Sequence, residues 1–202
     1  MTRSPCFNID MVFKNDQVSE KETEFIIRTA RECLGVSGDF VELGCYKGDT
    51  SLALAEVLKN SSSDKKLWLY DSFEGLPEKS LNDESVLGKD FKSGELMVTK
   101  REVKERFLRA GLKVPIIKKG WFNDFSSDDL PEKIAFCFLD GDFYESIRDG
   151  LKLIENKMSD GSILIVHDYE NPALPGVKKA VDEWISTRSL QVLETCAIIS
   201  LD

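Results

Sequence analysis

Histidine is the rarest chemically useful residue in this chain, with one among 202 residues. Basic residues are also outnumbered, because the chain has 27 lysines and arginines against 36 acidic residues and a net charge of −9. This balance argues against nucleic-acid backbones and anionic membranes as partners. No apolar run is long enough to cross a bilayer, and residues 1–12 lack the apolar core of a signal peptide. We therefore expect neither a nucleic-acid nor a membrane partner.

The sequence also lacks any CxxC pair and any internal repeat. Its five cysteines are scattered: Cys6, Cys33, Cys45, Cys137 and Cys196. An odd number of unpaired thiols favours reduced cysteines in a cytosol, which predicts a cytoplasmic protein. The length suits one domain. We place this domain at residues 19–202, after an N-terminal arm at residues 1–18 that shows no clear hydrophobic period.

Beyond the arm, short apolar segments alternate with amphipathic ones. Capping boxes open two of the predicted helices, Ser19 with Glu22 and Thr99 with Glu102. The predicted strands are 39–43, 66–70, 115–118, 134–139 and 162–168, the last following an Asp160-Gly161 turn, with a closing hairpin at 190–201. The predicted helices are 19–34, 50–58, 99–110, 177–185 and a segment carrying Ile147, Leu151, Ile154 and Met158. The alternation predicts a doubly wound α/β domain with a mostly parallel sheet.

The most informative stretch runs from Ile134 to Ser146. A continuous apolar run stops on Asp140 and Asp142, and an amphipathic helix follows. Carboxylates in this position lie at the carboxyl edge of a parallel sheet, where open α/β sheets bind ligands. Alternatively, one of the two aspartates caps the helix and the other is a solvated turn residue. We favour a functional site because a later strand also ends on an acid, Asp168.

A glycine-containing turn follows the first predicted strand. Gly44 and Gly48 allow a tight turn, and the next helix presents free N–H groups to an anion. The turn lacks the GxGxxG spacing of dinucleotide-binding folds, which weakens a nicotinamide-dependent oxidoreductase as a hypothesis. Asp71, which ends the next strand, is placed to accept both hydroxyls of a ribose.

Several motifs resemble one family in order and spacing: Val41-Glu-Leu-Gly-Cys-Tyr-Lys-Gly48, Tyr70-Asp-Ser-Phe-Glu-Gly-Leu-Pro77, Lys119-Gly-Trp-Phe122, Leu139-Asp-Gly-Asp-Phe-Tyr-Glu-Ser146 and His167-Asp-Tyr169. They are similar to the macrocin O-methyltransferase family of class I S-adenosylmethionine-dependent methyltransferases. Known members methylate sugar hydroxyls of macrolide and aminocoumarin antibiotics. The resemblance implies a single-domain Rossmann-like fold with a C-terminal antiparallel hairpin. The turn also resembles that of catechol O-methyltransferases.

The resemblance also implies how S-adenosylmethionine is held. Ser72 and Phe73 would line the adenine, Asp71 would bind the ribose, and Trp121 would approach the base. The residues around the methionine part would be Glu42, Gly44, Tyr46 and Thr50, and Asp140 would also border the cofactor. A homodimer is implied as well.

The family pattern further implies a divalent metal held by Asp140, His167 and Asp168, with Asp142 as the general base. The chain departs from the family at His167, where aspartate is usual. Three carboxylates suit Mg²⁺, whereas an imidazole shifts the preference toward a transition metal such as Mn²⁺. Loss of metal dependence stays open as an alternative.

The leading hypothesis is methyl transfer to a hydroxyl of a sugar-bearing small molecule. The alternatives are a phenolic, lipid or peptide acceptor, or a cofactor-binding protein with impaired catalysis. The polar segment 77–98 is either a lid over the acceptor pocket or a surface insertion, because so long a loop is usually functional or disordered.

Overall fold

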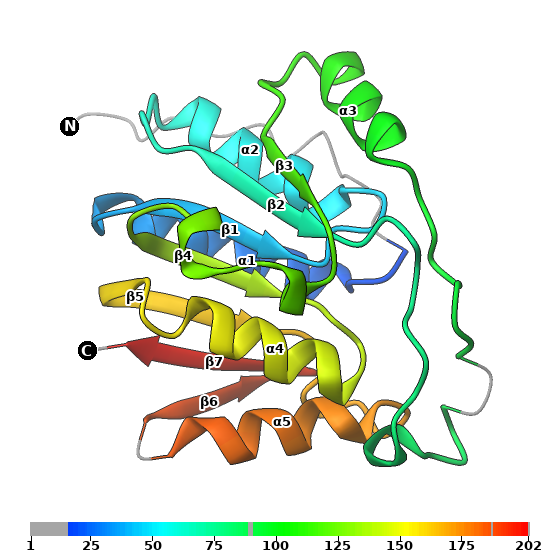
Figure 1. Ribbon diagram of the computed structural model, residues 1–202. Helices are drawn as coiled ribbons and strands as arrows, with labels where there is room; N and C mark the ends of the chain where they lie inside the picture. The colour runs from blue at the N-terminus through cyan, green and yellow to red at the C-terminus, as the bar shows by residue number, and fades with distance from the viewer. Residues whose placement is uncertain (1–15, 89–90, 187, 202) are drawn as a thin grey trace.

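The computed structural model describes residues 16–88, 91–186 and 188–201. One seven-stranded sheet organises the chain, with the strands in the order β3-β2-β1-β4-β5-β7-β6 (Figure 1). The strands are β1 (Asp39–Leu43), β2 (Leu67–Asp71), β3 (Ile116–Lys119), β4 (Ile134–Leu139), β5 (Met158–Val166), β6 (Leu190–Leu193) and β7 (Cys196–Leu201). The proposed arm lies outside the described residues except for 16–18.

The centre of the sheet is the most apolar part of the chain. Every residue of β4 is buried, and this strand pairs in parallel with β1 on one side and β5 on the other. Only a strand covered on both faces needs such a continuous apolar sequence. β7 pairs antiparallel with β5 and β6 antiparallel with β7, which forms the closing hairpin. The predicted doubly wound domain with its terminal hairpin is confirmed.

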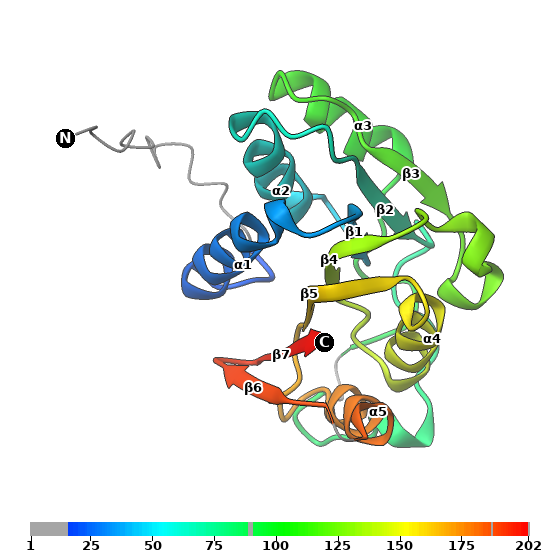
Figure 2. The same cartoon turned by 90° about the vertical axis from the view of Figure 1, so that its left-hand side faces the viewer.

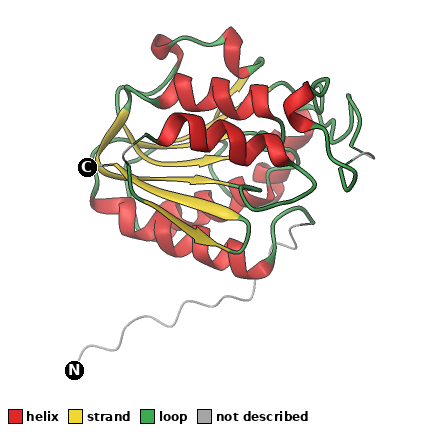
Figure 3. Cartoon of the chain, turned by 90° about the horizontal axis from the view of Figure 1, so that it is seen from below, coloured by secondary structure: helices red, strands yellow, loops and turns green. Residues whose placement is uncertain are grey.

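Helices cover both faces of the sheet (Figures 2 and 3). The helices are α1 (Glu20–Glu32), α2 (Asp49–Asn60), α3 (Lys100–Arg109), α4 (Tyr144–Ile154) and α5 (Pro175–Ile185). Side chains of the first three helices share one core cluster, and those of α4 and α5 share a second. Both predicted capping boxes are present, at Ser19 and Thr99. Among the described residues, no helix has the length and apolar character of a membrane span.

The join between α4 and β5 differs from the prediction. Met158 was expected on the helix, but α4 ends at Ile154 and Met158 is the first residue of β5. The Asp160-Gly161 turn therefore lies inside the strand, where the pairing with β4 shifts register. Gly161 has φ +76°, a conformation that glycine adopts readily, so the strand continues through the register shift.

Residues 77–88 run along the carboxyl ends of the strands from β2 down to α5, and residues 91–98 lead back to α3 (Figure 1). The described part of this segment includes one short 3₁₀ helix, Leu81–Asp83. Asp83 is buried and accepts hydrogen bonds from Ser80 and from the backbone N–H of Tyr144, 2.7 Å away. A Cβ on Gly88 would lie 2.0 Å from the carbonyl oxygen of Ala173. The segment is thus docked on α4 and on the loop before α5.

Candidate active site

A cavity of about 370 Å³ opens at the carboxyl ends of β1, β2, β4 and β5. The chain winds from β1 outward to β3 and then returns to β4, so the cavity lies where the strand order reverses. Open α/β sheets bind their ligands at this point. Most of the predicted site residues line it: Glu42, Gly44, Tyr46, Thr50, Asp71, Ser72, Trp121, Asp140, Asp142, His167 and Asp168.

The backbone at these strand ends is unusual. After each of the four strands, one non-glycine residue adopts a left-handed conformation: Tyr46 at φ 44°, Phe73 at 54°, Asp142 at 60° and Asp168 at 60°. Such residues cost free energy and persist where the surrounding structure holds them, which happens often at functional sites. The same distortion turns each chain sharply as it leaves the sheet.

The β1 end of the cavity is built for close backbone approach. A Cβ at Gly44 would lie 1.8 Å from the carbonyl oxygen of Asp140, so only glycine fits there. Gly48, at φ +83°, is the N-cap of α2, whose first turn carries Thr50. Below them Glu42 is 1% exposed, and its Oε2 has no hydrogen-bond partner among the described residues. Burial, with Asp140 and Asp71 nearby, raises the pKa of Glu42.

Asp71 holds the glycine turn in place. Its Oδ2 accepts the backbone N–H groups of Cys45 at 2.8 Å and Tyr46 at 3.1 Å, and its Oδ1 accepts that of Phe73 at 2.7 Å. A carboxylate has about four acceptor positions. Three are therefore occupied by the protein itself, and about one is left for a ligand hydroxyl.

Phe73 lies elsewhere than expected. Its side chain is buried in the core cluster that contains Val103 and Phe107, and it does not line the cavity. Its left-handed backbone turns the ring away, while its N–H supports Asp71. Trp121 does line the cavity, at the end of β3, together with Leu76 and Leu96, which the motif comparison did not select.

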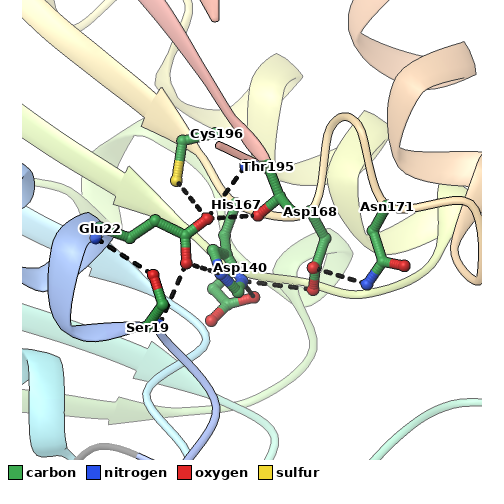
Figure 4. Close-up of polar contacts among 8 residues, drawn as sticks. All are labelled: Ser19, Glu22, Asp140, His167, Asp168, Asn171, Thr195 and Cys196. Atoms are coloured by element: carbon green, nitrogen blue, oxygen red, sulfur yellow. Dashed lines mark hydrogen bonds and ion pairs between the residues drawn. The ribbon is translucent and has the colours of Figure 1, made fainter. Parts of the chain in front are cut away.

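The ends of β4 and β5 bring together Asp140, His167 and Asp168 at the cavity (Figure 4). His167 Nδ1 lies 3.2 Å from Asp140 Oδ1 and 3.2 Å from Asp168 Oδ2. Asn171 fixes the other oxygen of Asp168 at 2.8 Å. Ligands at right angles around a cation, each about 2.1 Å from it, are about 3 Å apart. The spacing of these atoms therefore fits a shared divalent ion, and the nitrogen–oxygen donor set suits a transition metal.

One residue beside this group was recognised from the sequence only as a helix cap. Glu22 of α1 is 4% exposed, and its Oε2 lies 3.7 Å from His167 Nε2 (Figure 4). Burial opposes a charge on His167, but the carboxylates of Asp140, Asp168 and Glu22 outweigh it and raise the pKa of the imidazole. Sequence spacing offers no signal for this contact, since Glu22 and His167 lie on distant segments.

Asp142 occupies the cavity without a hydrogen bond to its carboxylate within the described part of the chain. The N-cap of α4 is Phe143, with no side-chain cap, and the N–H of Tyr144 bonds to Asp83 instead. The capping role considered for Asp142 is therefore filled by another residue. Burial, and then repulsion by Asp140 and Asp168, raise the pKa of Asp142.

The sheet order, the glycine turn and the acidic ends of β2 and β4 define a Rossmann-like class I methyltransferase fold. The chain belongs to the macrocin O-methyltransferase (TylF) family, whose sequence profile matches residues 20–196. The solved structure of the O-methyltransferase NovP superposes with a TM-score of 0.80 at 27% identity, covering 93% of this chain and 83% of that one.

Two characterised relatives are similar over most of the chain. A tetracenomycin-C 4'-O-methyltransferase of Streptomyces olivaceus, named for a rhamnosyl tetracenomycin, is 32% identical over 74% of this chain and 59% of its own length. The demethyldecarbamoylnovobiocin O-methyltransferase of Streptomyces niveus is 30% identical over 81% of this chain and 65% of its own. The chain thus matches less than two thirds of the length of these relatives.

Proposed function

We propose that this protein transfers a methyl group from S-adenosylmethionine to a hydroxyl of a glycosylated small molecule, assisted by a divalent metal. The observation that carries the proposal is that one cavity joins a cofactor end to an acidic end. Asp71 and Glu42 lie at the cofactor end. Asp142, which accepts no hydrogen bond from the described residues, lies at the acidic end with Asp140, His167 and Asp168.

The cofactor end fits the methyl donor. The unpartnered Oε2 of Glu42 would accept a hydrogen bond from its ammonium group, and the first turn of α2 would face its carboxylate. Asp71 would accept one ribose hydroxyl at its remaining position. Ser72 and Trp121 border the side where the base would lie. The bound donor supplies a methyl group on a sulfonium ion.

At the acidic end, Asp140, His167 and Asp168 would hold the metal. When bound, a divalent ion would orient the acceptor oxygens and lower the pKa of the attacking hydroxyl. Asp142 would take the hydroxyl proton, because its carboxylate lies in the cavity close to the charges of Asp140 and Asp168 and accepts no hydrogen bond from the described residues. Its raised pKa brings it closer to the operating range of a general base than an ordinary aspartate, whose pKa is about 4.

The acceptor of the proposed reaction is a sugar hydroxyl, which the relative named for a rhamnosyl tetracenomycin supports. The segment 77–98, whose Pro77 and Leu96 line the cavity, would cover the acceptor. A phenolic, lipid or peptide acceptor would use the same catalytic residues but would require a different acceptor-binding surface around them.

A methyl-transfer assay with radiolabelled S-adenosylmethionine tests the function. A panel of glycosides should be methylated faster than matched aglycones, phenols and peptides. Thermal stabilisation by S-adenosylhomocysteine but not by NAD would support the cofactor assignment. Stabilisation without turnover on any acceptor, with or without divalent metals, would favour a cofactor-binding protein and contradict the enzyme assignment.

A further inference from the structure

The carboxylate of Glu22 contacts three parts of the chain: the start of α1, the turn between β6 and β7, and the end of β5. It is the third residue of α1, and its Oε2 accepts the N–H of Ser19 at 3.1 Å. Its Oε1 accepts both the N–H and the hydroxyl of Thr195, at 3.1 and 2.6 Å, in the turn between β6 and β7. Its Oε2 also faces Nε2 of His167 at the end of β5. A helix cap alone requires only the first of these contacts.

The imidazole of His167 is oriented by these contacts. Nδ1 faces Asp140 and Asp168 inside the cavity, and Nε2 faces Glu22 behind it (Figure 4). Because His167 is only 4% exposed, bulk water does not reach Nε2 as an alternative hydrogen-bond partner. Side chains that could hold a metal lie on both sides of the ring, Asp140 and Asp168 at Nδ1 and Glu22 with Cys196 at Nε2, which is 3.7 Å from Glu22. A carboxylate that accepts the Nε2 proton would leave Nδ1 as the nitrogen that faces a metal.

We propose that Glu22 is a positioning residue that accepts the Nε2 proton of His167 and thereby presents Nδ1 as a ligand. The inference rests on the proposed metal site. It also supplies a physical reason why imidazole works in place of the family's usual aspartate. A carboxylate needs no partner to choose its donor atom, whereas a histidine ligand usually gives its other N–H to a carboxylate or carbonyl.

The substitution Glu22→Gln tests this role. Glutamine keeps the size of the side chain and is accepted at the third position of a capping box, so the fold should survive. Its single amide oxygen can replace only one of the two carboxylate oxygens, which accept from Ser19 and from Thr195 respectively. Calorimetric titration with Zn²⁺ should show affinity about 10–100-fold below wild type. Glu24→Gln, on an exposed position of the same helix, makes the same charge change and should match wild type within about threefold.

A double-mutant cycle separates positioning from general stability. In a His167→Asp background no imidazole remains to be oriented, so Glu22→Gln should leave Zn²⁺ affinity unchanged or improve it. An equal loss in both backgrounds would show that Glu22 acts only through the fold and would overturn the proposal. Thr195→Val removes one donor to Glu22 and provides a milder variant, expected to weaken Zn²⁺ binding by less than Glu22→Gln does.

The single histidine permits a direct spectroscopic reading. In untagged protein with Zn²⁺, a long-range ¹H–¹⁵N spectrum contains one imidazole and should show a protonated Nε2 and a metal-bound Nδ1. Glu22→Gln should reduce the fraction of the protein in which Nε2 is protonated and Nδ1 binds the metal. Wild type that binds Zn²⁺ through Nε2, or Glu22→Gln that binds as wild type does, would overturn the proposal while the metal site stands. No saturable binding by wild type, with S-adenosylhomocysteine still bound, would remove the metal site and the inference together.

Discussion

Two carboxylates of the cavity, those of Asp71 and Asp142, are held in opposite ways. Asp71 receives three backbone N–H groups, so its charge is matched by the fold before any ligand binds. Asp142 receives no hydrogen bond from the described residues, and Asp140 and Asp168 share one imidazole. Backbone donors therefore satisfy Asp71 within the fold, whereas Asp142, like the buried Glu42, keeps a charge that a cation or a proton must balance.

The largest test of this difference is Asp142→Asn. General-base catalysis contributes about 10²–10⁴-fold, so single-turnover methyl transfer should slow on that scale while cofactor and metal affinities stay nearly constant. Asp160→Asn, on an exposed part of β5, is the control. A rate within about threefold of wild type would end the base assignment, because asparagine cannot accept the proton.

The same residue gives a dependence on pH. Burial and neighbouring carboxylates raise the pKa of Asp142, and a base must be ionised to act. The single-turnover rate should therefore fall as the pH drops through the pKa of Asp142, which in the metal-loaded enzyme is set by burial and by the bound cation together. A rate that does not fall at acid pH would contradict the base assignment.

Removing Asp140 should weaken metal binding at the acidic end alone. Asp140→Asn deletes a charged ligand, and Zn²⁺ or Mn²⁺ affinity should drop more than the roughly 10–100-fold typical of an outer partner. Affinity for S-adenosylhomocysteine should change far less. His167→Asp should shift the preference toward Mg²⁺. The same weak, non-saturating titration in wild type and Asp140→Asn would mean that no metal site exists.

Asp71→Ala should affect the other end in two respects. Loss of one hydrogen bond to a charged group should weaken S-adenosylhomocysteine by about 1.5–3 kcal/mol, or about 10–150-fold. The three N–H groups left behind should also lower thermal stability. Calorimetry and a melting curve measure both effects, with the exposed Asp64→Ala as control. Unchanged affinity for S-adenosylhomocysteine would contradict the assignment of Asp71 to the ribose.

The smallest expected effect comes from the docking of segment 77–98. Asp83→Ala removes the acceptor of the Tyr144 N–H at the start of α4. Loss of a helix cap typically costs about 0.5–2 kcal/mol, which urea denaturation can measure. The neighbouring exposed Glu84→Ala should be neutral. Equal stability of the two variants would show that Asp83 does not anchor this segment.

Sequence patterns predicted the features that depend on local spacing. The acids at the ends of β2 and β4, Asp71 and Asp140, follow from apolar periodicity, and the capping box at Ser19 from residue type. The strand predicted to reach Asp168 instead ends at Val166. Features that depend on contacts between distant segments were not predictable. Neither the cap that Asp83 supplies to α4 nor the partnership of Glu22 with His167 has a local signature.

Backbone conformation caused the remaining differences. A left-handed Phe73 sends its ring into the core, although the motif around it implied a place beside the adenine. Glycine at 161 continues a strand through an irregularity, although the Asp-Gly pair reads as a turn. Both residues have a positive φ, and the local sequence indicated neither the buried ring of Phe73 nor the continued strand at Gly161.

The link between Glu22 and Thr195 has a consequence for how the protein is made. The two residues are 173 positions apart, and Thr195 belongs to the hairpin formed by the last two strands. On the ribosome, where the N-terminal part of a chain emerges first, α1 exists for many seconds before its partner is synthesised. His167 therefore acquires its full set of neighbours only after Thr195 has left the ribosome, and the acidic end of the cavity should mature later than the pairing of β1 with β4.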